Sequence, residues 1–288
     1  MESKPSIAGE DWTLVVGPKT SWFKLELKEL WKCRDLISVF AKRDIISVYR
    51  QTLLGPLWLI LQPILVTLIF VVVFQQIVKL PTDGTSGPLF YLSGITLWNY
   101  FSTSFAKISN TFVTNAPLFG KVYFPRLAIP VSTLLSTLVT FVIQFMFFFI
   151  LLLYFTLVKG TEMKINSAIL LLPVLLVIVA GISFGTGIII SSLTAKYRDL
   201  SYVIPFATQL LMFVTPIIYP LSLLEGKKRI FLLANPMTSL IETFRYSLLG
   251  AGQFNWVYLA YSAFFMVVVL FIGIILFNRT EKNFMDTV

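Results

Sequence analysis

The 288-residue sequence contains no histidine and only one cysteine, Cys33. Without histidine, the chain has neither histidine general bases nor the histidine metal ligands of zinc proteases. One cysteine can form neither a disulfide within the chain nor a metal cluster, so we expect a structural role for Cys33. The sequence therefore predicts no catalytic residues and no metal site.

The sequence also lacks the phosphate-binding loop G-x-x-x-x-G-K-[ST] of many ATPases. Its two Gly-Lys pairs, at positions 120–121 and 226–227, are followed by valine and lysine instead of serine or threonine. The long apolar runs hold almost no ionisable residue, although ion-coupled carriers usually keep one there as a relay. We therefore expect a chain that is not an enzyme and that depends on another subunit for any transport energy.

Charge is scarce: charged residues make up 13% of the chain and hydrophobic residues 57%, whereas soluble domains have roughly 25% charged residues. A helix that crosses a hydrocarbon core of about 30 Å needs about 20 apolar residues. Six charge-free runs reach this length, at residues 51–78, 84–106, 127–158, 165–195, 200–224 and 246–278. They predict an all-α integral membrane protein with a six-helix transmembrane domain at 51–278, a cytoplasmic N-terminal segment at 1–50 and a cytoplasmic tail at 279–288.

Basic residues are distributed unevenly between the two sides that six spans define. The side that carries both termini holds sixteen of the 23 lysines and arginines, and the other side holds seven. Because basic loops stay in the cytoplasm, this bias predicts that both termini are inside. The cluster Lys227-Lys228-Arg229 on the outer side argues against that orientation. We attribute the net charge of +9 to loops that face anionic membrane lipid, not to nucleic-acid binding.

An amphipathic helix is predicted before the first span, with Ser21 as its N-cap. Its apolar residues recur near helical spacing: Phe23, Leu27, Leu30, Trp31, Ile37, Phe40 and Ala41. It is either an interface helix with a partner or a lipid-lying anchor without one. Three Arg-Asp dipeptides, at 34–35, 43–44 and 198–199, are interpreted as adjacent ion pairs at the membrane edge.

Between the fifth and sixth runs lies a segment too polar to cross a membrane. Asn235 is a candidate N-cap, Pro236 suits the first helical position, and Gly250 can end a helix that pairs Glu242 with Arg245. Residues 221–233 would form a shorter partner helix. The plain alternative is an interfacial hairpin without a transport role.

Three blocks of sequence together resemble those of a known family. They are RDIISVYRQTLLGPLW at 43–58, AKYRDLSYVIPFATQLLMFVTPIIYP at 195–220 and NPMT at 235–238. With them, the chain from about residue 20 resembles the membrane subunits of polysaccharide-exporting ABC transporters, the family of O-antigen, teichoic-acid and capsule exporters. The first 20 residues fall outside the resemblance, and we assign them no function.

The resemblance implies a bacterial inner-membrane permease with six spans that forms a homodimer. Two copies of a separate ABC ATPase would bind it, and ATP and Mg would bind that partner, so no cofactor is expected in this chain. The complex would export a lipid-linked glycan. The alternatives are a drug- or lipid-exporting ABC permease and a membrane-bound transferase, which the missing histidine and missing intramembrane carboxylate disfavour.

The resemblance also implies roles for particular residues. The N-terminal helix and the loop after the second span, where a short helix is predicted at Asn115-Ala116-Pro117, would rest on the ATPase. The turn KYRDL (196–200) resembles the other inner turn, although it is equally readable as a headgroup anchor. The candidate coupling residues are Trp31, Arg34, Pro117, Phe119, Lys121, Tyr123, Arg126, Tyr197, Arg198 and Asp199.

The segment at 221–250 corresponds in the family to short re-entrant helices on the outer face. Its candidate gate residues are Asn235, Pro236, Glu242 and Arg245. Aromatic rings can stack on the flat C–H faces of sugars, although many aromatics of membrane proteins simply face lipid or the interface. The candidate substrate-channel residues on the spans that line the pore in the family are Trp58, Tyr91, Trp98, Tyr100, Phe206, Phe213 and Tyr219.

Overall fold

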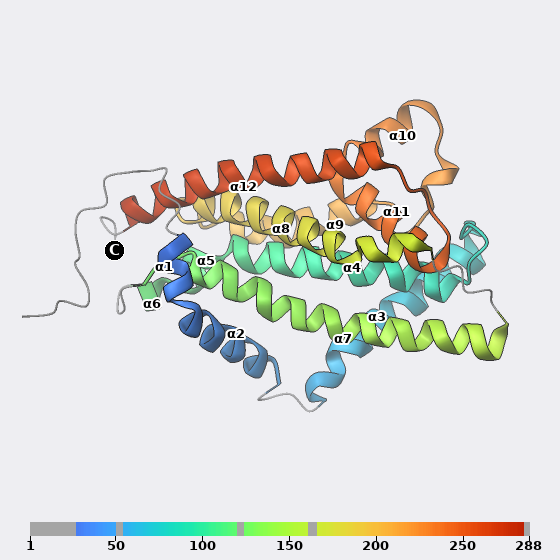
Figure 1. Ribbon diagram of the computed structural model, residues 1–288, viewed down its shortest axis with the longest axis horizontal. Helices are drawn as coiled ribbons and strands as arrows, with labels where there is room; N and C mark the ends of the chain where they lie inside the picture. Colours follow the sequence, from blue (N-terminus) through green and yellow to red (C-terminus); the bar gives the residue numbers. More distant parts are fainter. Residues whose placement is uncertain (1–26, 50–53, 120–123, 161–165, 285–288) are drawn as a thin grey trace, which may run out of the picture.

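The computed structural model describes residues 27–49, 54–119, 124–160 and 166–284. All regular secondary structure in these ranges is helical, which confirms the predicted all-α class. Long helices run side by side along the long axis of the molecule (Figure 1). They are α4 (Gly87–Ser109), α7 (Ala128–Lys159), α8 (Leu172–Thr194) and α12 (Trp256–Phe284).

Four stretches of the described chain are long and apolar enough to cross a membrane, so the protein is a multi-pass membrane protein. They are Gly55–Ile77, Ala128–Lys159, Ser167–Thr194 and Trp256–Glu281. The first consists of η1 (Gly55–Leu57), α3 (Trp58–Phe70) and the π-helical η2 (Val71–Ile77), and the third begins with η3 (Ser167–Leu171). Of the other two predicted spans, 84–106 corresponds to the continuous helix α4, and 200–224 contains only a shorter helix.

The run at 200–224, which the sequence predicts as one span, does not form one continuous helix. Helix α9 (Leu200–Phe213) ends after 14 residues, which at 1.5 Å per residue is about 21 Å, shorter than the hydrocarbon core. The run at 246–278 also contains a break, because Gly250 adopts a left-handed φ of 66° that ends the preceding helix. The last long helix therefore begins only at Trp256.

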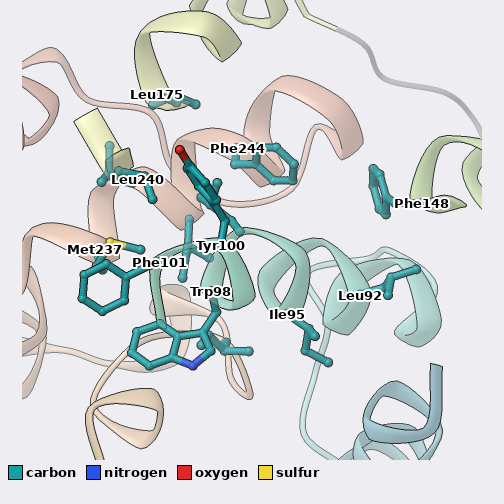
Figure 2. Packing of buried hydrophobic residues seen from close by; sticks show 14 of the residues in the cluster. Leu92, Ile95, Trp98, Tyr100, Phe101, Phe148, Leu175, Met237, Leu240 and Phe244 are labelled. Atoms are coloured by element: carbon teal, nitrogen blue, oxygen red, sulfur yellow. The ribbon is translucent and has the colours of Figure 1, made fainter. Parts of the chain in front are cut away.

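Helix α4 forms the centre of the bundle and contacts α7, α8, α9, α11 and α3. Several of its hydroxyl groups are paired within the protein: Ser93 donates to the Phe90 carbonyl at 2.8 Å, and the hydroxyls of Ser104 and Thr137 on α7 lie 2.7 Å apart. Figure 2 shows its side chains Trp98 and Tyr100 among residues of the surrounding core. Because α4 is enclosed by other helices, polar side chains replace part of the apolar surface that a lipid-facing helix would need.

Helices α8 and α12 approach each other closely at two glycines. A Cβ atom at Gly185 would lie 2.8 Å from the backbone nitrogen of Leu270, and one at Gly273 would lie 2.7 Å from the Gly185 carbonyl oxygen. Small residues let helix backbones approach in this way inside membranes. The contact joins the fourth predicted span to the sixth.

The N-terminal part consists of two helices, α1 (Leu27–Lys32) and α2 (Arg34–Tyr49), where the sequence had predicted one continuous helix. They lie at one end of the bundle with α5 (Thr111–Thr114) and α6 (Ala116–Phe119), and we call this the α2 end (Figure 1). The predicted N-cap Ser21 and apolar residue Phe23 lie outside the described residues. The opposite end carries η4 (Leu221–Leu223), α10 (Gly226–Leu233) and α11 (Pro236–Leu249), and we call it the α11 end.

Helix α2 is amphipathic as predicted, since Ile37, Phe40 and Ala41 are buried and α2 packs on α7. Trp31, another of the predicted apolar residues, is 71% exposed within the protein. The break between α1 and α2 at Cys33 shifts the register of the apolar positions. Cys33 itself is a half-buried free thiol.

Candidate functional site

Helix α11 begins and ends as its sequence predicts. The Asn235 side chain accepts a hydrogen bond from the Met237 backbone nitrogen at 3.0 Å, Pro236 is the first helical residue, and Gly250 follows the last. The predicted pairing of Glu242 with Arg245 is also present, with 3.7 Å between Oε1 and Nη1. Sequence spacing did not reveal that both side chains are buried, at 1% and 0% exposure.

Arg245 is the central polar contact of the α11 end. Its two terminal nitrogens donate to the carbonyls of Pro216 and Ile217, the second at 2.8 Å, and its guanidinium carbon lies 3.7 Å from the centre of the Phe90 ring. Gly94 leaves room for the guanidinium, because a Cβ there would lie 2.7 Å from Nη2. Arg245 therefore connects α11, α4 and the irregular segment after α9.

Glu242 joins α11 to the loop before α12. Its Oε2 atom accepts a hydrogen bond from the Gln253 backbone nitrogen at 3.1 Å. Burial raises the pKa of the Glu242 carboxyl, and the charge of Arg245 and the Gln253 N–H oppose that rise. A buried pair of this kind fixes one arrangement, because separating it leaves an uncompensated charge inside the protein.

Three of the seven candidate channel aromatics lie inside the chain on α4. Tyr91, Trp98 and Tyr100 are 0%, 5% and 4% exposed, and Tyr100 packs on Phe141 with ring centres 5.4 Å apart. The Tyr91 hydroxyl is buried without a hydrogen-bond partner among the described residues. These rings are core residues of the single chain, so a role in lining a conduit stays a prediction.

The other four candidates are less deeply buried, and Tyr219 alone of them packs against the same core. Trp58, Phe206 and Phe213 are 46%, 62% and 49% exposed. Tyr219 is half-buried, and its hydroxyl donates to the Phe213 carbonyl at 2.9 Å. A single chain thus does not gather the seven aromatics into one pore, and their common site would require a second copy or a different conformation.

At the α2 end, the N-terminal helix and the loop after α4 form one aromatic cluster. Phe40 of α2 lies 5.5 Å from Phe124, which lies 5.9 Å from Phe119 of α6, and Phe119 lies 5.8 Å from Phe112. The predicted short helix after Asn115 is α6. A force on either α2 or α6 would therefore reach Phe112 of α5 through packed rings.

Arg126 is also an internal residue of this end. It is 5% exposed, donates to the Glu281 carbonyl at 3.0 Å and lies over the Phe119 ring at 5.2 Å. Burial lowers the pKa of Arg126, and Glu281 opposes that shift. Arg126 and Phe119 would therefore act on a partner through packing, not through direct contact.

The remaining coupling candidates present exposed side chains at the α2 end. Trp31, Arg34 and Pro117 are exposed, and Arg34 lies 5.9 Å from the Trp31 ring. Tyr197, Arg198 and Asp199 are exposed in the turn between α8 and α9. Lys121 and Tyr123 lie outside the described residues.

The Arg-Asp dipeptides differ from one another. Arg43 and Asp44 form an ion pair at 2.9 Å, and Arg34 and Asp35 a longer one at 3.9 Å. Within the described part of the chain, Arg198 and Asp199 form no ion pair, which corrects the interpretation of the third dipeptide. Their charges are available to a partner or to solvent.

One polar contact between spans was not predicted from the sequence. Gln144 on α7 donates to the Leu59 carbonyl of α3 at 3.1 Å, and the Asn99 amide of α4 lies 3.5 Å from its oxygen. Gln144 is the only amide in the apolar run 127–158, which was an available signal. It ties three helices together where water is scarce.

Within the described ranges, no group of three or more cysteine, aspartate or glutamate side chains could hold a metal ion. The described residues instead form a buried ion pair, Glu242 with Arg245, at the α11 end and an exposed surface at the α2 end. A chain of packed helices connects the two. Such an arrangement suits a conformational change driven at one end.

Comparison with known families agrees with this arrangement. Residues 35–249 match the family described as ABC-2 type transporter. The chain belongs to this family. It is therefore a transport component, and the matched region extends from α2 to the end of α11.

Individual relatives cover nearly the whole chain. An O-antigen export system permease protein RfbA of Klebsiella pneumoniae is 25% identical over 88% of this chain and 94% of its own length. The RfbA protein of Myxococcus xanthus is 28% identical over 76% of this chain and 82% of its own. The polysialic acid transport protein KpsM of Escherichia coli is 27% identical over 83% and 91%, respectively.

Proposed function

We propose that this ABC-2 family member is the permease subunit of an exporter that moves a lipid-linked, O-antigen-like polysaccharide from the cytoplasm across the bacterial inner membrane. The observation that carries the proposal is the similarity to permeases named for O-antigen and polysialic acid over most of both chains. The missing phosphate-binding loop supports a separate ABC ATPase as the source of energy, with ATP and Mg bound there.

The proposed complex contains two permeases and two ATPases. A two-fold axis would place the same surface of each permease at the interface and complete a conduit between the copies. The exposed apolar side chains of α9, among them Tyr202, Val203 and Phe206, are compatible with lipid or with a second copy. Both termini lie in the cytoplasm in this proposal, so the α2 end faces the ATPase and the α11 end faces outward.

Six spans are part of the proposal. Four come from the apolar stretches of the structure, and α4 and α9 supply the other two. Helix α4 has 23 residues, enough to cross the hydrocarbon core. Helix α9 reaches the outer side only with the irregular segment that Arg245 holds, and α10 and α11 would then form the re-entrant pair at the outer face.

Deleting the gene in its bacterium tests the function. The cells should lose their surface polysaccharide and accumulate lipid-linked glycan on the cytoplasmic face, and a plasmid copy should reverse both effects. Normal surface glycan together with increased drug sensitivity would instead support the drug-exporting alternative. The sugar composition of the lipid-linked glycan that accumulates in these cells identifies the glycan.

A further inference from the structure

An apolar groove lies between the end of α9 and α10. Helix α10 lies at the α11 end of the protein (Figure 1). The volume of the groove is about 500 Å³, within the range of roughly 300–1,000 Å³ that is typical of ligand pockets. We call it the α9–α10 groove. Its apolar lining, which we call the floor, includes Phe213, Tyr219, Leu224 and Phe231, and its charged lining consists of Lys227 and Lys228.

The groove combines an apolar interior with positive charge only. Lys227 and Lys228 are exposed and form no ion pair within the described part of the chain, and no acidic residue lines the groove. The hydroxyl of Tyr219 is already engaged with the Phe213 carbonyl. Few neutral polar groups remain for a sugar, whereas an apolar chain with an anionic head would match both parts of the surface.

The same two lysines belong to the basic cluster that contradicts the charge bias of the sequence. The third member, Arg229, donates to the Gln253 side chain and does not line the groove. Basic residues on the outer side of a membrane protein are disfavoured by the topology rule. A specific anionic ligand gives Lys227 and Lys228 a reason to be there that the rest of the fold does not supply.

We propose that the α9–α10 groove binds a lipid that carries a phosphate group, with the lipid chain on the apolar floor and the phosphate at Lys227 and Lys228. Two sources share this chemistry, a phospholipid of the membrane and the polyprenyl phosphate end of an exported glycan. The second source rests on the proposed function, and the first does not. Lipid bound here would contact both α9 and α10, so it would stabilise the α11 end in the arrangement described.

Native mass spectrometry of the purified permease complex in nanodiscs tests the affinity. Phosphatidylglycerol and undecaprenyl phosphate, each added to phosphatidylcholine, should be retained more strongly than phosphatidylcholine itself. Each lysine near an anionic phosphate contributes about a fivefold factor in affinity. Lys227→Gln with Lys228→Gln should therefore weaken retention about 25-fold, and Arg229→Gln, which removes one charge beside the groove, should leave it unchanged.

Cysteine labelling locates the lipid. In a Cys33→Ser background, Phe231→Cys should react with N-ethylmaleimide severalfold more slowly when anionic lipid is present than in phosphatidylcholine alone. The lysine double variant should abolish that difference. A cysteine in place of Phe264, an exposed residue of α12, serves as the control and should react at one rate in all three lipids.

Three results would overturn the proposal: equal retention of neutral and anionic lipid, unchanged retention by the lysine double variant, or no reaction of Phe231→Cys in any lipid. The last result would mean that protein, such as a second copy, covers the groove. If only undecaprenyl phosphate slows the labelling, the bound lipid is the polyprenyl phosphate end of the cargo. If both anionic lipids slow it, the groove binds phosphate-bearing lipids in general. Lipid binding without glycan export would leave this inference intact and refute the proposed function.

Discussion

Arg245 and Phe90 lie in direct contact, with the guanidinium carbon 3.7 Å from the centre of the ring. The ring belongs to α4 and the arginine to α11, so the contact joins the core helix to the α11 end. The same guanidinium holds the two carbonyls that follow the end of α9. Opening the α11 end without breaking these contacts would require α11 and the segment after α9 to move together.

The first prediction concerns the buried ion pair between Arg245 and Glu242. Arg245→Met should destabilise the protein by about 3–5 kcal/mol, because Glu242 is left buried without its partner. The double variant Arg245→Met with Glu242→Leu should recover part of that loss. It should not recover all of it, since the carbonyls of Pro216 and Ile217 still lack a donor.

Thermal unfolding of the detergent-purified protein measures Arg245→Met, Glu242→Leu and the double variant as a double-mutant cycle. Arg229→Gln is the control, because this arginine is less buried and contacts a glutamine. A single variant as stable as the parent would show that the Arg245 contacts do not hold the α11 end.

The second prediction compares two tryptophans from the same candidate set. Trp98→Ala should lower the yield of folded complex strongly, since truncating a buried tryptophan costs about 3–5 kcal/mol. Trp58→Ala, at a side chain that is 46% exposed, should leave the yield near normal. Export per folded complex, measured with complex yield in the same cells, separates folding from transport.

A normal yield with slow export in Trp98→Ala would contradict its assignment to the core and support a direct role in the conduit. Slow export at normal yield in Trp58→Ala would support contact between Trp58 and the glycan. If both variants export as much glycan per complex as the parent protein, neither ring lines the conduit.

These comparisons show what the sequence could and could not predict. Local signals worked well at α11, where Asn235 and Gly250 mark the ends through the chemistry of single residues. The end of α9 at Phe213 was not assigned to a residue, because the run 200–224 is free of charge throughout and hydropathy alone carries no information about where a helix stops. The charge-free run 246–278 also includes residues 246–249, which belong to α11, as the Gly250 signal had predicted.

Burial inside a membrane protein was the main property that the sequence did not reveal. In water, apolar periodicity separates a core face from a polar face, but a lipid-facing surface is as apolar as the core. Tyr91 and Trp98 therefore looked the same as the exposed Phe206. The pairing of Glu242 with Arg245 followed from spacing, whereas the contacts of Arg245 with α4 and with the segment after α9 depend on distant parts of the chain.

The third prediction concerns the polar contact between α3, α4 and α7. Gln144→Leu should destabilise the protein by about 1–2 kcal/mol, since it removes the bond to the Leu59 carbonyl in an environment with little water. Thr156→Val is the control on the same helix, because the Thr156 hydroxyl bonds only within α7. Thermal unfolding decides, and equal stability of the two variants would assign no special role to Gln144.

The fourth prediction concerns assembly. The permease should purify as a dimer that captures two ATPase subunits and hydrolyses no ATP alone, because the chain lacks a phosphate-binding loop. The mass of the intact complex and ATPase assays of each part test this. A stable monomer with ATPase activity of its own would refute both the stoichiometry and the division of labour.

The last prediction concerns the turn KYRDL between α8 and α9. Tyr197, Arg198 and Asp199 are exposed there, and Thr194 just before the turn donates to the Ser109 carbonyl of α4 at 2.7 Å. A partner that presses on the turn would therefore move α8, α9 and the core helix together. We expect Arg198→Asp with Asp199→Arg to leave complex yield normal but to uncouple ATP hydrolysis from export.

The alternative role, an anchor at lipid headgroups, predicts a different outcome. Exposed charges of this kind contribute about 0–1 kcal/mol, so an anchor would tolerate the swap with full export. A cysteine at Tyr197, in a Cys33→Ser background, should cross-link to the ATPase, with a yield that changes on nucleotide binding. Swapping Arg43 and Asp44 on α2 is a matched control, because that dipeptide already forms its own ion pair. Full export by the Arg198/Asp199 variant and no cross-link in either nucleotide state would establish the turn as a membrane-edge anchor.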